Sequence, residues 1–174
     1  MTQADADSQF LVAGLRHFPD AHATVGAFRR IVAEKVEAIL RASRPDVWSS
    51  KEVKPTRAES NGLWVGAGGP MALVAMPGKV LSLDVGICWG SSYFPERVMA
   101  VADVYSASEV IGQRVQEPAG ERVRVVRVGS RQDRFATPVS GESSDVEHAF
   151  HLVVEAAAIG VADAIARRPN AADT

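Results

Sequence analysis

The feature that most constrains the fold is an alternation of apolar residues in two successive segments, 80–89 and 98–105. In the first segment every odd-numbered position is apolar: Leu81, Leu83, Val85, Ile87 and Trp89. In the second segment the even-numbered positions are apolar: Val98, Ala100, Ala102 and Val104. Successive side chains of a strand point to opposite faces of the sheet, so this alternation predicts two strands that each bury one face. The short connection between them predicts an antiparallel hairpin.

The register of this hairpin follows if the loop at residues 90–96 brings Trp89 opposite Val98. Large residues of the first strand then face small or β-branched residues of the second: Ile87 faces Ala100, Val85 faces Ala102 and Leu83 faces Val104. Large residues opposite small ones leave room for a helix to lie across the strands. This face of the sheet is therefore expected to lie under a helix.

Two amphipathic helices are predicted on either side of the strands, over residues 21–43 and 144–167. Their apolar residues recur at spacings of three and four. In the first helix these are Val25, Phe28, Val32, Val36 and Ile39, and in the second they are Val146, Phe150, Val153, Ala157, Val161 and Ala164. A separate helical turn over residues 10–18 is expected to end at Pro19.

Four further strands are predicted at residues 62–67, 71–76, 122–128 and 134–139. Turns are expected at residues 68–70, which read Gly-Gly-Pro, and at Pro77-Gly78. Together these elements predict an α+β fold: a two-layer sandwich in which an antiparallel sheet of about six strands packs against N-terminal and C-terminal helices. The length of 174 residues fits a single domain over residues 10–168, with disordered tails at 1–9 and 169–174.

Composition indicates where in the cell the protein is located and which class of molecule it binds. The net charge of −2 does not favour nucleic-acid binding, which usually needs a basic face. A single cysteine, Cys88, fits a reducing compartment. The first residues lack the pattern of a signal peptide, and no uninterrupted apolar run approaches the length of a membrane helix. We therefore expect a cytoplasmic protein without a membrane segment; its high usage of Ala, Val, Arg and Gly is typical of GC-rich bacterial genomes.

The predicted register places two acidic residues opposite each other on the second face of the hairpin, Asp84 and Asp103. Like charges in this position are unfavourable, so a metal ion, a shared proton or a basic neighbour has to offset them. Arg122 and Arg124 share one face of the next long strand and could supply the positive charge. One interpretation is a solvated sheet face with ordinary ion pairs, in which Asp103→Asn is neutral or mildly stabilising. The other is a catalytic site formed by Asp84, Asp103 and Arg124 that binds a divalent metal.

The acidic pair is similar to the acidic residues that metal-dependent nucleases carry on a hairpin. Those enzymes also need a lysine two residues after the second acid, a position that Tyr105 occupies in this chain. The segment Glu52-Val53-Lys54 has the required form but lies in a polar connection. A metal-dependent hydrolase or nuclease-like enzyme is therefore the alternative hypothesis rather than the leading one.

Three residues of the C-terminal helix form a second candidate metal site. His148, His151 and Glu155 are spaced i, i+3 and i+7, so they share one face of the helix, away from the apolar stripe. Imidazole and carboxylate groups are common ligands of zinc and iron. Such residues are also frequent on solvated helices, and no known zinc motif surrounds them. Cys88 has no catalytic signature around it, so we expect it to be buried in its strand.

The tip of the predicted hairpin carries two aromatic residues, Tyr93 and Phe94. Aromatic side chains in an exposed loop are typical of protein interfaces, although they can also fold back over a sheet edge. With no catalytic motif and no implied cofactor, the leading hypothesis is a small intracellular protein-binding module of the immunity, antitoxin, chaperone or adaptor type. Tyr93 and Phe94 are its candidate binding residues. Self-association of the chain is compatible with this hypothesis.

Overall fold

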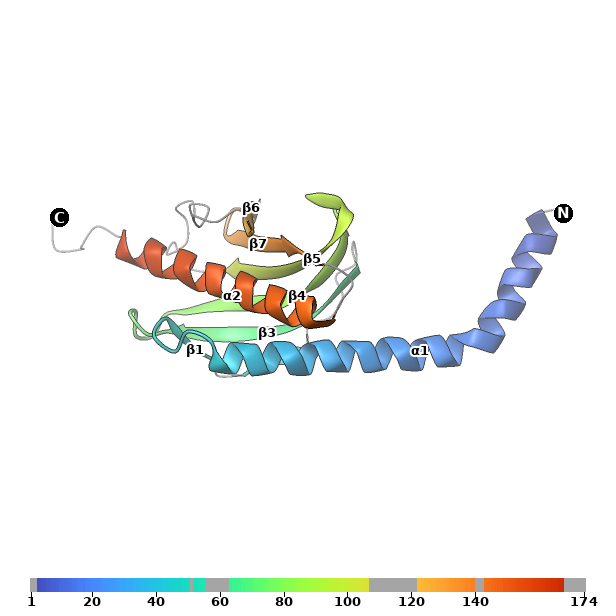
Figure 1. Ribbon diagram of the computed structural model, residues 1–174, viewed down its shortest axis with the longest axis horizontal. Helices are drawn as coiled ribbons and strands as arrows, with labels where there is room; N and C mark the ends of the chain where they lie inside the picture. Colours follow the sequence, from blue (N-terminus) through green and yellow to red (C-terminus); the bar gives the residue numbers. More distant parts are fainter. Residues whose placement is uncertain (1–2, 51, 56–62, 107–121, 140–142, 168–174) are drawn as a thin grey trace.

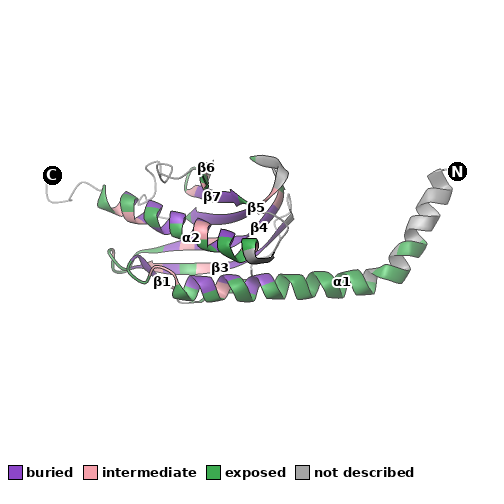
Figure 2. Ribbon diagram, in the orientation of Figure 1, coloured by how far each residue is buried: buried purple, intermediate pink, exposed green. Residues whose placement is uncertain are grey.

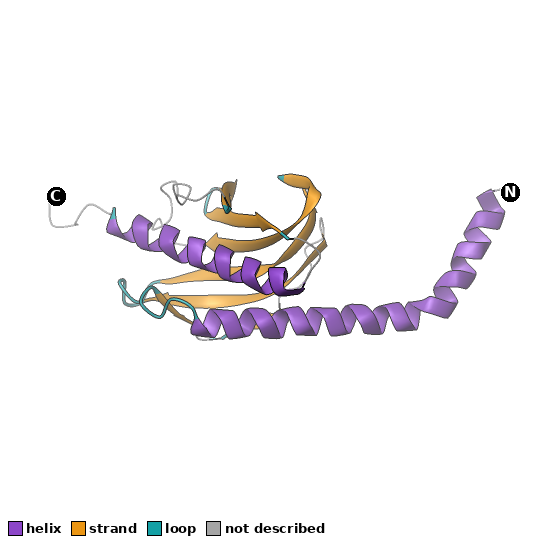
Figure 3. Ribbon diagram, viewed as in Figure 1, coloured by secondary structure: helices purple, strands orange, loops and turns teal. Residues whose placement is uncertain are grey.

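The computed structural model describes residues 3–50, 52–55, 63–106, 122–139 and 143–167. An antiparallel sheet lies between two helices in the sequence, and both helices cover the same face of it (Figures 1 and 3). The elements are α1 (Gln3–Ala42), β1 (Trp48–Ser50), β2 (Lys54–Pro55), β3 (Leu63–Leu73), β4 (Val80–Ser91), β5 (Phe94–Tyr105), β6 (Arg124–Gly129), β7 (Gln132–Pro138) and α2 (Ser143–Ala166). The predicted two-layer α+β architecture is confirmed.

The strands follow the order β1-β3-β4-β5-β7-β6, and the short strand β2 also pairs with β3. The central hairpin β4–β5 has the predicted register, with Trp89 opposite Val98 and Val85 opposite Ala102. Its turn is shorter than expected, because the strands continue to Ser91 and Phe94. A bulge at Gly90, where φ is 60°, accommodates this extension.

The prediction of a turn at residues 68–70 is wrong, because β3 runs through them as one continuous strand. Two short strands share the outer side of β3. β2 pairs with Ala67 and Gly68, and β1 pairs with the segment that begins at Met71. Pro70 falls between these two partners, where its missing N–H breaks no pairing with them. Gly69 lies so close to the backbone carbonyl of Glu52 that a side chain would collide with it.

The main core lies between the sheet and the two helices. Val85, Ala102 and Phe135 of the sheet are completely buried in it, beneath Val36 of α1 and Val153 of α2. The apolar stripes predicted for both helices therefore supply this core, as their spacing indicates. In α1, however, the part of the stripe that reaches the core begins only at Val32.

Helix α1 is longer than predicted. It begins at Gln3, so residues 3–9 belong to the helix in the structure rather than to a tail, and it continues through Pro19. Helix α1 bends in its N-terminal part (Figure 1). A proline inside a helix removes one hydrogen bond and is a common cause of such a kink. The N-terminal part of α1 projects past the end of the sheet, and every described side chain from Val12 to Ile31 is exposed (Figure 2). The predicted tail at 169–174 lies outside the described residues.

Helix α2 is long and apolar enough to cross a membrane, by length and composition alone. An 18-residue window within Asp145–Ala166 has a mean hydropathy of 1.7, but half of that window is buried inside the protein. The buried side chains, including Phe150, Val153 and Val161, belong to the core. Core helices of soluble proteins have the same composition, so the hydropathy of α2 is explained by its packing.

Candidate functional site

The acidic pair lies in a row of residues that crosses the sheet on the face without helices. From β3 to β6 the residues opposite one another are Gly68, Asp84, Asp103, Arg134 and Val126. Asp84 and Asp103 therefore face each other as predicted. Their neighbours along the strands, Val85 and Ala102, point to the other face and are buried beneath the helices.

The positive charge beside Asp103 is supplied by Arg134 of β7. The Nε atom of Arg134 donates to Oδ1 of Asp103 at 2.7 Å, and its Nη2 atom donates to Oδ2 at 2.6 Å. Gln132 donates a further hydrogen bond to Oδ2 at 3.2 Å. Each side chain of the ion pair is only 9% exposed. Both oxygens of Asp103 are thus occupied by protein donors.

The prediction that Arg122 or Arg124 would face the acidic pair is wrong. It assumed that the first strand of the second hairpin lies beside β5, but β7 takes this place and β6 is the outer strand. Arg124 consequently lies opposite Ala136, two strands away from Asp103, and is exposed. The strand order, rather than the alternation within a strand, decides which arginine meets the carboxylate.

Arg134 also contacts an aromatic ring from a distant strand. Its guanidinium carbon lies 5.6 Å from the ring centroid of Trp64 in β3, within the range of a cation–π interaction. Three strand spacings of about 4.8 Å separate β3 from β7, so both side chains lean over the strands between them. Gly66 and Gly86, which lie opposite each other on this face, have no side chain to obstruct that approach.

A small apolar cluster adjoins the ion pair on the same face of the sheet. Its buried members are Trp64, Cys88, Met99, Val101 and Ala136. The burial of Cys88 in the middle of its strand is as expected for a structural cysteine. The helix-free face is therefore a second, smaller core with one ion pair inside it.

The candidate metal ligands of α2 do not form a cluster. Among the described residues, the structure contains no group of three or more His, Cys, Asp or Glu side chains that could hold a metal ion. His148 and His151 are exposed. Glu155 instead accepts a hydrogen bond from Arg44 at 2.8 Å, which ties α2 to the segment after α1.

Arg44 organises the end of α1 through a second carboxylate as well. It donates to both oxygens of Asp46, at 2.9 and 2.8 Å. Its hydrogen bond to Asp46 lowers the pKa of that carboxyl. Arg44 has a left-handed backbone, with φ of 49°, a conformation that commonly ends helices and usually falls to glycine. The two ion pairs indicate that this arginine is structural.

Of the two candidate aromatic residues at the hairpin tip, Tyr93 has a described side chain. Tyr93 lies in the turn between β4 and β5 and is 43% exposed. Its hydroxyl donates a long hydrogen bond of 3.5 Å to the backbone oxygen of Arg127. The side chain of Phe94 lies outside the described part of the structure. The binding function assigned to this tip stays a prediction.

An apolar groove lies between the two helices, at the place where α1 leaves the sheet. Its volume is about 380 Å³. The groove is lined by Phe28, Ile31, Val32 and Lys35 of α1, Ile87 of β4, and Val146, Glu147 and Phe150 of α2. Phe28 is 39% exposed and Ile31 is 49% exposed. The ring of Trp89 lies 6.0 Å from that of Phe28 and links the groove to the end of the central hairpin.

One ion pair bridges the two helices beside this groove. Lys35 of α1 donates to Glu147 of α2 at 2.8 Å. This hydrogen bond lowers the pKa of Glu147. The bridge holds the helices together and leaves the apolar residues between them accessible.

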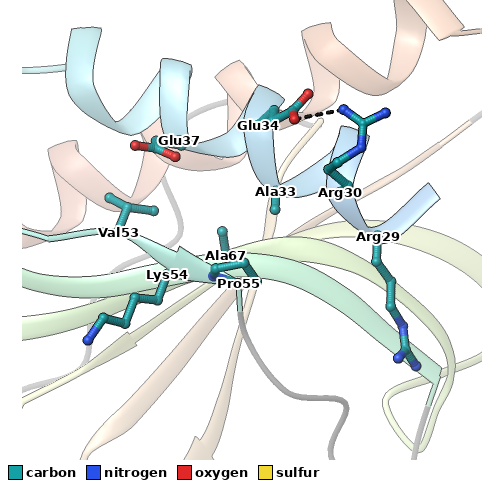
Figure 4. Close-up of a pocket in the computed structure, with 9 residues that line it drawn as sticks. All are labelled: Arg29, Arg30, Ala33, Glu34, Glu37, Val53, Lys54, Pro55 and Ala67. Carbon is teal, nitrogen blue, oxygen red and sulfur yellow. Dashed lines mark hydrogen bonds and ion pairs between the residues drawn. The ribbon is translucent and has the colours of Figure 1, made fainter. Parts of the chain in front are cut away.

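A second cleft, of about 330 Å³, separates α1 from β2 and β3 (Figure 4). Its rim is charged, but the charges are largely paired within the protein. Glu34 pairs with Arg30, Glu37 pairs with Arg41, and Lys54 pairs with Glu52. These ion pairs leave few charges available for a ligand, so the apolar groove is the better candidate for a binding site.

Comparisons with protein-family models, with curated proteins and with solved structures find no match to this chain. The candidate site thus depends on the geometry of the chain itself. Sequence reasoning missed both Arg134 and the groove. Arg134 lies in a predicted strand, but its local pattern resembles that of Arg124, and only the strand order separates the two. The groove had no signal, because it depends on where two helices separate.

Proposed function

We propose that this protein is a protein-binding module and that it binds through the projecting part of α1 and the groove at its base. The observation that carries the proposal is the exposure of Val25, Phe28 and Ile31. Val25 and Phe28 continue the apolar stripe that Val32 and Val36 bury in the core. An amphipathic helix whose apolar face extends past its own domain is typical of a helix that packs on a partner.

The groove adds a concave element to this surface. Interfaces commonly centre on pockets lined by aromatic and aliphatic residues, which a partner side chain fills. The groove offers Phe28 and Phe150 in such an arrangement, with the Lys35–Glu147 ion pair beside them. The turn between β4 and β5, which carries Tyr93, lies at the end of the sheet from which α1 projects (Figure 1), so Tyr93 is a further candidate contact.

Immunity proteins, antitoxins, secretion chaperones and adaptors bind other polypeptides without chemistry of their own, and we place this protein in that functional class. A cytoplasmic location fits this class. The alternative of a metal-dependent hydrolase has less support. A metal at Asp103 would have to displace Arg134 from both carboxylate oxygens, which is strongly unfavourable for a buried guanidinium.

Site-specific photo-crosslinking in cells tests the proposal. A photoreactive residue at position 25 or 31 is expected to form an adduct with another polypeptide, which mass spectrometry identifies. Position 23 is the matched control, because Ala23 is exposed in the same helix but lies about 200° around it from Val25. Adducts no more abundant at positions 25 and 31 than at position 23 would contradict the proposal.

A further inference from the structure

Helix α1 consists of an anchored part, which packs in the core, and a projecting part, which does not. From Val32 onward one side of the helix is buried against the sheet and α2. Phe28 makes a ring contact with Trp89, at 6.0 Å between centroids. Among the described side chains of residues 12–27, by contrast, none is buried (Figure 2). Packing, which supplies most of the stability of helices in proteins, therefore acts on α1 only from about Phe28 onward.

The sequence of the projecting part also disfavours helix. Relative to alanine, a glycine such as Gly26 weakens helix formation about fivefold, and a proline such as Pro19 weakens it roughly a hundredfold. Pro19 has no N–H to donate to the carbonyl one turn earlier. The hydroxyl of Thr24 donates to the backbone carbonyl of Asp20 at 2.8 Å, a bond that slightly destabilises helices. Neither packing nor sequence thus stabilises helix in residues 12–27.

The anchored part can extend helix only a short way toward the N-terminus. The core already holds the turns from Val32, so no new nucleus is needed for the next residues. Each added residue then gains or loses little, because the equilibrium constant for extension is near 1 even for good helix formers. Gly26 opposes this extension and Pro19 interrupts it. N-terminal to Pro19, helix would need a costly nucleus of its own.

We infer that the projecting part of α1 unfolds and refolds locally while the rest of the domain stays folded. The helix of Figure 1 is the folded side of this equilibrium. Local unfolding of this kind is common for segments with few buried contacts. The inference has one consequence that rests on the proposed function: binding through Val25 and Phe28 must also order the helix. The helix propensity of residues 12–27 then sets part of the affinity.

Limited digestion of the full-length protein with trypsin tests the local unfolding. Trypsin cleaves an extended backbone, so the rate of cleavage follows the population of the unfolded segment. Arg16 lies in the projecting part, whereas Lys35 and Arg41 lie in the anchored part, and all three side chains are accessible. Cleavage after Arg16 is expected to be on the order of a hundredfold faster. Similar rates after Arg16 and Arg41 would overturn the inference.

Hydrogen exchange measured by mass spectrometry tests the same point without a protease. Amides 20–27 are expected to exchange nearly as fast as those of an unfolded peptide. Amides 33–41 belong to the same helix and serve as the internal control, with exchange slower by on the order of a hundredfold or more. Equal protection of the two segments would show that α1 opens as one unit and would overturn the inference.

Gly26→Ala tests whether helix propensity controls the equilibrium. No group lies within 4 Å of the position that the added methyl group would take, so the change makes no new contact. It is expected to slow exchange of amides 20–27 by up to about fivefold and to increase the helical signal in circular dichroism. Ala38→Gly, at an exposed position of the anchored part, is the control that should leave amides 20–27 unchanged. Gly26→Ala without effect on either measurement would overturn the equilibrium.

These experiments separate the local unfolding from the proposed binding function. Slow exchange of amides 20–27 together with crosslinks at positions 25 and 31 would overturn the local unfolding and leave the proposed function intact. Fast exchange without such crosslinks would support the local unfolding and contradict the proposed function.

Discussion

The two faces of the sheet are buried to different extents and by different means. Beneath the helices, Leu83, Val85 and Ala102 are completely buried among apolar side chains. On the other face, Asp103 and Arg134 are almost as buried, but they depend on each other and on Gln132. Apolar packing tolerates many arrangements of similar volume, whereas a buried charge is stable only with its partner in place. The comparison teaches that the helical face is stabilised by apolar volume, whereas the buried charges of the other face require both partners of one ion pair.

A charge placed in the helical face should have the largest effect. Val85→Asp is expected to unfold the domain, because an unpaired carboxylate would enter a completely buried site among apolar side chains. Circular dichroism and thermal melting measure the outcome. The matched control is Val80→Asp on the same strand, where Val80 is 43% exposed and little change is expected. A normal melting curve for Val85→Asp would show that the two faces do not differ in this way.

Removing one partner of the buried ion pair should have the next largest effect. Asp103→Asn is expected to destabilise the protein by about 3 kcal/mol, because it removes the carboxylate charge that accepts two hydrogen bonds from the buried Arg134 guanidinium. The position of Arg134 therefore reverses the neutral or stabilising effect expected from the repulsion between Asp84 and Asp103 alone. Chemical denaturation of the variant measures this difference.

A double variant sharpens the same comparison. Replacing both partners with apolar residues of similar volume, Asp103→Leu together with Arg134→Met, should cost much less than either single change, since no unpaired charge remains. If the losses in free energy of unfolding from the two single changes add up in the double variant, the two residues are not coupled. The helix-free face would then resemble the helical face in its energetics.

The exposed ion pair between the helices should have the smallest effect. Glu147→Gln removes the Lys35 bridge and is expected to shift the melting temperature only slightly. Lys35 lowers the pKa of Glu147 in the folded protein, so the unfolded chain binds more protons as the carboxyl titrates. The stabilisation is thus present above the ordinary value of 4.5 and is lost as pH falls below it. Melting curves of wild type and variant that converge in acid would support this assignment, and a constant difference would contradict it.

The hairpin β4–β5 and the core faces of both helices were predictable from the sequence alone. Their signals are local periodicities, which the backbone geometry of strands and helices imposes within a few residues. The opposition of Asp84 and Asp103 followed from the same periodicity. The continuous strand β3 was missed because glycine and proline are strong turn signals, and these residues stand here where β3 passes from one partner strand to another.

The candidate site was less predictable, since its members are distant in sequence. Arg134 reaches Asp103 only because β7, rather than β6, pairs with β5, and no local pattern distinguishes these two orders. The length of α1 was underestimated because Pro19 argues for an interruption, whereas the structure continues the helix through it with a bend.

By itself, the sequence determined which face of each element is apolar, because side-chain periodicity is a property of the local backbone. It thereby determined the two-layer architecture and the register of the central hairpin. Only the tertiary structure decided which arginine neutralises Asp103 and where α1 leaves the sheet, because both depend on contacts between segments separated by many residues. The apolar surface at the base of α1 is left uncovered because α1 leaves the sheet at that place.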